Sequence, residues 1–192
     1  MNTVDLKHAY RLLNHGPTVL VGSAHADRSN VMAAAWAMPL DFDTPKVAVV
    51  IDKSTLTREL VDASGVLSLN VPCVAQRDEV TAAGGMSGKN HPDKLARCRM
   101  GADLAAQTGV PLVDGCIAQL ECRVLPATAH VAGPHDLILA EVLAAWADER
   151  VFSDGHWHFE DAAPELRSLH HVAGGHFYAI GEPVSALPVA NA

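Results

Sequence analysis

The chain has 192 residues, of which 49% are hydrophobic and 19% charged, a composition typical of a single folded domain with a sizeable core. It carries 14 Lys and Arg against 22 Asp and Glu, a formal net charge of −8, which argues against nucleic acid or an anionic membrane as a partner. No run approaches the roughly 18 apolar residues needed to span a bilayer, and the N-terminal segment lacks the apolar stretch of a signal peptide. We therefore expect a cytoplasmic protein that binds neither nucleic acid nor membrane.

The charge is distributed unevenly along the chain. Residues 1–100 carry 11 Lys and Arg against 10 Asp and Glu, whereas residues 101–192 carry 3 against 12. An anionic ligand is therefore expected in the first half. The four cysteines include no C-x-x-C pair, so buried thiols are expected rather than a disulfide framework.

The start of the chain predicts a short helix and then a meander of three strands. Apolar side chains at helical spacing indicate a helix over residues 4–13, which stops before Gly16-Pro17. The strands are expected at 18–24, 31–40 and 46–52, with turns at 27–30 and 41–45 and with Pro39 closing the second strand. Residues 31–40 could also form a helix, but their position between two strand-like runs favours a strand.

After residue 53 the apolar period becomes helical, with Ser54 as a candidate N-cap and Gly65 at the helix end. A strand is expected at 66–71, followed by a helical or irregular stretch at 73–105. From Ile117 apolar and polar residues alternate, and this run is expected to form a long hairpin with the strand 135–148, which follows a turn at Gly133-Pro134. A last strand is expected at 176–182. Only one strand–helix–strand crossover is predicted, which favours an antiparallel barrel with added helices over a doubly wound parallel sheet. We expect one domain over residues 1–182, followed by a C-terminal tail over 183–192.

The segment from Asp52 to Arg58 is the most informative part of the sequence. A strand leads directly into a helix here, and two cations and three hydroxyl groups gather at the helix N-terminus. The first turn of a helix has unpaired N–H groups and the positive end of the helix dipole, so it suits a phosphate. A simple N-cap with solvated Lys53 and Arg58 would produce the same pattern, and both interpretations stay open.

The glycine-rich run at 83–90 does not match a known nucleotide or nucleophile motif. A P-loop would need Gly in place of Ala83 and Ser or Thr in place of Asn90, and a nucleophile elbow would need Gly in place of Lys89. What remains is a loop that leads into a basic segment. That segment could cover an anionic cofactor or form a solvated surface helix.

Histidines are numerous, with 11 in the chain, and they raise the question of a metal site. His156 and His158 would share one face of a strand, and His170, His171 and His176 follow downstream. No further ligands stand at a diagnostic spacing, so we expect exposed or hydrogen-bonded histidines and no specific metal site.

Taken together, these segments resemble the flavin reductase-like family of FMN-binding split barrels, the group that includes flavoredoxin. The matching segments occur in the family's order and cover about residues 10–181: Gly16 to Val21, Asn30 to Ala37, Pro45 to Val50 with Ser54-x-x-Thr57, Val66 to Pro72, Ser87 to Leu95, Leu120 to Val124, and His176 to Tyr178. Each segment is weak evidence alone, whereas their order and spacing are fairly specific. The resemblance implies a mainly β fold with added helices, an antiparallel Greek-key split barrel of the FMN-binding type.

The resemblance also implies a set of cofactor-binding residues. The flavin ring would lie along the strand that contains Asn30, Met32, Ala33, Ala34, Ala35 and Trp36. The phosphate would be held by Lys53, Ser54 and Thr57, with Arg58 as a helper. The edge of the cofactor would meet Asn70 and Val71, and the loop over it would contain Ser87, Gly88 and Lys94. The small side chains at 33–35 would let main-chain groups approach the ring. The family frequently has Thr where this chain has Ala33, so a hydroxyl contact to the flavin is missing here.

The implied activity is electron transfer from NADH or NADPH through bound FMN to free flavin or another acceptor, including a redox partner protein. No catalytic side chain is implied, because the flavin carries the chemistry. Two alternatives remain: an FMN electron carrier without NAD(P)H turnover, and a non-enzymatic barrel that binds haem or metal. A homodimer is the family expectation.

Overall fold

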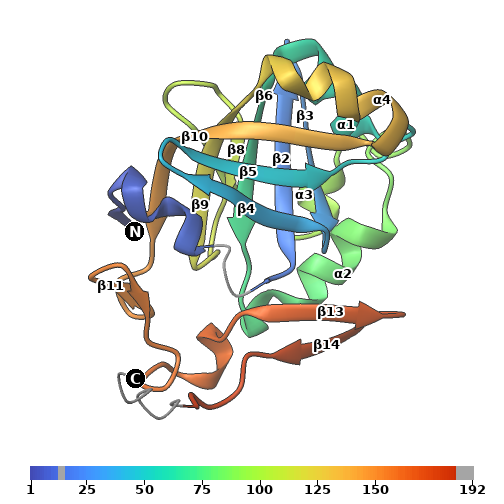
Figure 1. Ribbon diagram of the computed structural model, residues 1–192. Coiled ribbons are helices and arrows are strands. Elements are labelled where there is room, and N and C mark those ends of the chain that lie inside the picture. The colour runs from blue at the N-terminus through green and yellow to red at the C-terminus, as the bar shows by residue number, and fades with distance from the viewer. Residues whose placement is uncertain (13–15, 185–192) are drawn as a thin grey trace.

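The computed structural model describes residues 1–12 and 16–184. Within these residues the main sheet has eight strands in the order β3-β2-β6-β9-β10-β5-β4, with β1 paired to β10. The strands are β1 (Asn2–Thr3), β2 (Val19–His25), β3 (Arg28–Ala34), β4 (Ala37–Phe42), β5 (Pro45–Val50), β6 (Val66–Val71), β9 (Ala118–Val124) and β10 (Leu137–Ala147). Every pair in this sheet is antiparallel, and the sheet curls without closing between β3 and β4 (Figure 1). The predicted fold class, a mainly antiparallel split barrel with added helices, is confirmed.

The single strand predicted at 31–40 is wrong. The chain breaks at Ala35 and Trp36, and β3 and β4 on either side of the break form the two opposite edges of the sheet. No glycine or polar turn residue indicates this break, because the sequence stays apolar and small across it. Pro39 lies inside β4 rather than at its end, a position that an edge strand tolerates because one side of it needs no N–H donor.

The helices cover the open ends and faces of the barrel (Figure 1). They are η1 (Leu6–Leu12), α1 (Leu56–Ser64), η2 (Val74–Gln76), α2 (Arg77–Gly85), α3 (Lys94–Arg97), η3 (Pro126–Thr128), α4 (Ala129–His135) and η4 (Pro164–Leu166). The predicted end of α1 at Gly65 is confirmed, since this residue adopts the left-handed conformation with φ 71°. The predicted N-cap is wrong by one residue: Thr55, not Ser54, accepts the capping bond from the Arg58 N–H.

The long hairpin is confirmed as β9 and β10. In this hairpin Val124 lies opposite Ala140 at one end and Ala118 lies opposite Ala147 at the other, with a bulge between Val142 and Ala144. The turn predicted at Gly133-Pro134 is wrong, because both residues lie within α4. The three two-stranded ribbons outside the main sheet are β7 (Ala102–Leu104) with β8 (Pro111–Val113), β11 (Phe152–Ser153) with β12 (His156–Trp157), and β13 (Leu169–Ala173) with β14 (His176–Ala179).

The inner face of the barrel is the main core. Alternate residues of the strands are fully buried there, among them Val47, Val49, Leu67 and Leu120. A second, smaller core lies beneath α2 and is built on Leu20, Val31 and Val80 together with other buried residues. All four cysteines are free and buried, as predicted, and burial raises the pKa of each thiol. No described helix could cross a membrane.

Candidate functional site

A cavity of about 600 Å³ lies where the two sheet edges, α2 and the β13–β14 ribbon meet. Its size is within the usual range of ligand pockets. Its lining residues come from six parts of the chain: Thr18, Met32, Ala33, Ala34, Ala35, Trp36, Val50, Asp52, Val80, Thr81, Gly84, Gly85, His171, Gly175 and Phe177. All five residues predicted to lie along the flavin ring, Met32 to Trp36, are among them.

One wall of the cavity is made of residues with very small side chains. It comprises Ala33, Ala34 and Ala35 at the β3–β4 break and Gly84 and Gly85 at the end of α2. A side chain at Gly84 would touch the Ala33 methyl group at 3.5 Å, whereas one at Gly85 would meet no atom within 4 Å. Main-chain groups therefore face the cavity on this side, where a flat ligand can lie close to them.

A second wall is aromatic and comes from the end of the chain. His171 and Phe177 are cross-strand partners in the β13–β14 ribbon, and their ring centroids are 5.3 Å apart in an edge-to-face arrangement. The ribbon lies beside α2, outside the barrel (Figure 1). The sequence raises His171 as a candidate for a metal site and places Phe177 within the closing strand, but it does not place them at this cavity, because they lie about 150 positions from Thr18, with which they share it.

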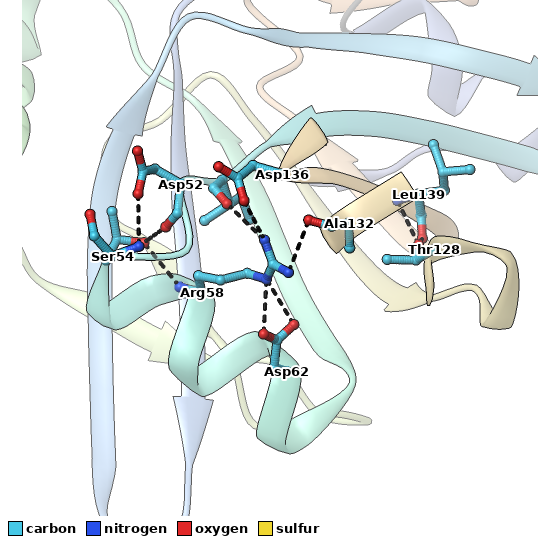
Figure 2. A network of polar contacts seen from close by, with 10 residues as sticks. Asp52, Ser54, Arg58, Asp62, Thr128, Ala132, Asp136 and Leu139 are labelled. Atoms are coloured by element: carbon cyan, nitrogen blue, oxygen red, sulfur yellow. Dashed lines mark hydrogen bonds and ion pairs between the residues drawn. The ribbon is translucent and has the colours of Figure 1, made fainter. Parts of the chain in front are cut away.

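The N-terminus of α1 lies next to the cavity through Asp52. The Asp52 carboxylate accepts the Ser54 N–H at 2.7 Å, and this bond holds the pKa of Asp52 below its ordinary value. Figure 2 shows Asp52 and Ser54 at this turn. Within the described residues the N–H groups of Leu56 and Thr57 have no acceptor, so the first turn of the helix keeps two donors and its positive dipole end for an anion.

Three predicted residues meet in a buried contact at the same place. The Asn30 amide donates to the Thr57 hydroxyl at 2.8 Å, and both side chains are buried. Gly88 packs so closely against Asn30 and Leu56 that a Cβ there would collide with both. The loop that contains Ser87 and Gly88 therefore packs against the first turn of α1.

Lys94 supplies the strongest electrostatic observation. The residue is 3% exposed, and its amine makes no hydrogen bond or ion pair with any residue that the structure describes. Burial lowers the pKa of its amine. A buried cation without a counter-ion is costly, and an anionic ligand would relieve that cost. Lys53 is exposed, as is Ser54.

Arg58 must be removed from the predicted phosphate ligands. Its guanidinium is 9% exposed and forms ion pairs with Asp62 at 2.9 Å and Asp136 at 3.2 Å. It also donates to the Ile51 and Ala132 carbonyls. Figure 2 shows the side chain extended from α1 toward α4 at the centre of this network. All three of its nitrogens donate to groups within the protein, so Arg58 joins α1, the end of β5 and α4 rather than binding a ligand.

Asn70 and Val71 must also be removed from the predicted set. Asn70 is fully buried, donates to the Leu20 carbonyl and accepts the Val113 N–H at 2.9 Å. It therefore holds β8 against the sheet, and its hydrogen-bonding capacity is used there. Val71 is fully buried in the main core, and neither residue lines the cavity.

The described histidines are not gathered into a cluster of possible metal ligands. In residues 1–12 and 16–184, no group of three or more His, Cys, Asp or Glu side chains could hold a metal ion. His156 and His158 are in and next to the short β11–β12 ribbon, where His158 contacts the Ser153 hydroxyl at 3.0 Å.

The model of the flavin reductase-like domain matches residues 11–185 of the sequence. The chain belongs to the flavin reductase-like family. It is 44% identical over 186 residues to the uncharacterized protein YddH of Escherichia coli K12, with 95% of this chain and 96% of that protein covered. It is 28% identical over 144 residues to the FMN reductase (NADH) RutF of Stutzerimonas stutzeri, covering 74% and 77% of the two chains.

Solved structures of this family share the fold. An FMN-binding domain of a flavin reductase-like enzyme from Shewanella baltica superposes with a TM-score of 0.94 at 47% identity, covering 96% of both chains. The flavoredoxin of Desulfovibrio vulgaris (Miyazaki F) superposes with a TM-score of 0.74 at 26% identity, covering 89% of this chain and 90% of that one.

The residues of this chain fit an FMN molecule. The cavity offers main-chain groups on one wall, and the N-terminus of α1, which reaches the cavity through Asp52, offers two N–H donors without an acceptor among the described residues. Lys94 on α3 is a buried cation without an ion pair in the described part of the chain. The sequence missed several cavity residues, namely Thr18, Val50, Asp52, Val80, Thr81, Gly84, Gly85, His171, Gly175 and Phe177. Asp52, Gly84-Gly85 and the histidine-rich ribbon lie in segments that drew attention in the sequence, and Val50 and Phe177 lie in segments that match the family, but none of them was predicted as a cavity residue.

Proposed function

We propose that this protein binds FMN in the cavity and transfers electrons from NADH or NADPH through it to free flavin or another acceptor. The observation that carries the proposal is a cavity walled by main-chain groups next to the N-terminus of α1, where two N–H donors have no acceptor among the described residues. Flavin binding needs both features, one for the phosphate and one for the ring.

In this proposal each part of the site has a definite task. Lys94, Lys53 and the free N–H groups of Leu56 and Thr57 bind the phosphate. The main chain of Ala33 to Ala35 contacts the polar edge of the ring, and the Asn30–Thr57 contact keeps the loop at Gly88 in place. Bound FMN supplies hydride acceptance and onward electron transfer. The protein's contribution to that chemistry is position, water exclusion and charge.

Two kinds of relative support different electron routes. The RutF proteins of Stutzerimonas stutzeri and Variovorax paradoxus are named FMN reductase (NADH) at 28% identity, which favours a reductase with NADH as donor. The similarity to flavoredoxin at 26% identity favours an FMN electron carrier that does not itself oxidise NAD(P)H. We give the reductase precedence because the cavity is wide and lined by apolar groups, and so leaves room for a second substrate beside the flavin.

Anaerobic titration of the FMN-loaded protein decides between the routes. The reductase predicts that NADH or NADPH bleaches the flavin absorbance near 450 nm, a range typical of oxidised flavin, with stoichiometric oxidation of the nucleotide. If dithionite bleaches the bound flavin and neither nucleotide does, the carrier is the correct alternative. A protein that binds no FMN would refute both.

A homodimer belongs to the same proposal. The edge strand β4 and Trp36 just before it expose a row of large apolar side chains: Trp36 74%, Met38 55%, Leu40 46% and Phe42 66%. Such a contiguous apolar surface is typical of an interface between subunits. Trp36 also lines the cavity, so a second subunit seated on β4 would complete the site at its open side.

A further inference from the structure

The β13–β14 ribbon has two different faces. His171 and Phe177 are cross-strand partners, so their side chains project from the same face, and both line the cavity. The neighbouring residues Val172 and Tyr178 are 57% and 70% exposed. The ribbon therefore presents an aromatic pair to the cavity and a different set of side chains to solvent.

The aromatic face is held rigidly at its base. Thr18 is 3% exposed; its N–H donates to the Leu169 carbonyl at 2.7 Å, and its hydroxyl oxygen accepts the His171 N–H at 2.9 Å. The Ile180 N–H donates to the Ser168 carbonyl at 3.1 Å. The Thr18 bonds fix β13 to the residue that precedes β2, and the Ile180 bond joins the end of β14 to the start of β13.

Packing fixes the position of Phe177 as well. The ring is half-buried and lies against the smaller core cluster built on Leu20, Val31 and Val80, while another part of it faces the cavity. The ring of His171 meets it at 62°, one of the arrangements that aromatic pairs prefer. His171 itself is exposed, so the pair is not simply a plug for the core.

The two walls of the cavity differ in what they can bind. The wall of Ala33–Ala35 and Gly84–Gly85 admits a ring to the main chain, and Phe177 and His171 belong to the other wall. Among the residues that line the cavity, Asp52 carries a carboxylate, and this carboxylate already accepts a hydrogen bond from the Ser54 N–H. A second planar ring in this cavity would therefore find an aromatic contact and an imidazole on the side of the ribbon.

We propose that the β13–β14 ribbon recognises the planar aromatic ring of the second substrate, with Phe177 as its contact surface and His171 as its polar contact. This inference rests on the proposed FMN site and adds to it the residues that select the partner of the flavin. The shared chemistry is a flat heteroaromatic ring with a polar edge, which describes both the nicotinamide of a dinucleotide and the ring of a free flavin. Thr18 is a positioning residue, since its hydroxyl holds the main chain of His171.

Equilibrium binding to the oxidised, FMN-loaded protein tests this inference without turnover. NAD⁺ reports on a nicotinamide ring, and lumichrome, a flavin ring without the ribityl phosphate, reports on a free flavin; either is followed by the change in flavin absorbance. The variant Phe177→Leu keeps an apolar side chain against the core but removes the aromatic ring. We expect it to weaken binding of at least one of the two compounds about two- to tenfold, the range of an aromatic pair, with FMN affinity within twofold of wild type.

Matched variants separate recognition from folding. Tyr178→Leu removes an aromatic ring from the same ribbon on the face that does not line the cavity, and it should leave both affinities unchanged. Phe177→Trp should restore the affinity that Phe177→Leu loses. His171→Ala should weaken the same compound as Phe177→Leu.

The outcomes are decisive. Loss of NAD⁺ affinity alone assigns the ribbon to the electron donor, and loss of lumichrome affinity alone assigns it to the acceptor; both support the inference. Unchanged affinity for both compounds in a Phe177→Leu protein that still binds FMN overturns it and leaves the proposed function intact. A wild-type protein that binds no FMN overturns the proposed function itself.

Discussion

Replacing Arg58 by Met separates a structural role from a ligand-binding role at the entry to α1. The substitution leaves the Asp136 carboxylate and the Ile51 and Ala132 carbonyls without the donor that now pairs with them. The Asp62 partner is 57% exposed, so its loss contributes little. Removing one member of a buried charged network costs about 3–5 kcal/mol, and we expect the lower end, about 3 kcal/mol, because Asp62 returns to water.

The assay is urea unfolding followed by circular dichroism, together with FMN titration of the folded variant. In a chain of this size, about 3 kcal/mol lowers Tm by roughly 6–12 °C. Arg28→Met is the matched control, since Arg28 pairs with Glu59 on the same helix but both side chains are about half exposed, and it should cost less than about 0.5 kcal/mol. FMN affinity should stay within threefold in both variants. A stable Arg58→Met protein with FMN affinity reduced tenfold or more would refute the structural role and restore Arg58 to the phosphate site.

Three further predictions concern charge, packing and assembly. Lys94→Met should weaken FMN binding at least tenfold in a fluorescence titration without lowering Tm. Because burial lowers the pKa of Lys94 in the folded protein, the unfolded chain binds more protons, so the wild-type apoprotein should gain stability relative to the variant as the pH rises toward about 10.4. A stability difference that stays constant between pH 7 and 10 would contradict this. Asn70→Ala should cost about 2–4 kcal/mol in urea unfolding, since it leaves buried groups of Leu20 and Val113 unpaired, while FMN affinity stays unchanged; a tenfold loss of affinity would return Asn70 to the site. Met38→Lys should shift the protein from dimer to monomer in light scattering, whereas Leu104→Lys, at a residue 70% exposed away from β4, should not, and a wild-type monomer would refute the dimer.

The sequence predicted a helix or strand well where the spacing of its apolar residues and a residue that ends the element are both present. The helix that ends at Gly65 and the strands of the β9–β10 hairpin are examples, because glycine in the left-handed conformation and two-residue alternation are local properties. The break at Ala35–Trp36 could not be predicted. It is set by the need to cross from one sheet edge to the other, a property of the whole barrel that leaves no turn residue in the sequence.

For the candidate site too, local stretches of sequence were easier to interpret than contacts between distant residues. The row from Met32 to Trp36 and the entry to α1 are each contiguous in sequence, and Met32 to Trp36 line the cavity. The family pattern also implied Arg58 and Asn70 as cofactor residues, but the hydrogen bonds of their side chains depend on partners far along the chain, such as Asp136 and Val113. Phe177 was missed as a cavity residue for the same reason, since only the fold brings its ribbon to the cavity.

FMN binding by a protein whose cavity has been filled is the most direct test of the central claim. A Cβ at Gly85 meets no atom within 4 Å, and Gly85 lines the cavity, so Gly85→Leu places a side chain in the ligand's space without a clash in the fold. Gly133→Leu is the control, because Gly133 also lies in a helix with no atom within 4 Å of a Cβ and does not line the cavity. We predict that wild type and Gly133→Leu quench FMN fluorescence with the same affinity and that Gly85→Leu, folded by circular dichroism, loses at least tenfold. Equal FMN affinity in all three proteins would contradict the placement of the flavin in this cavity.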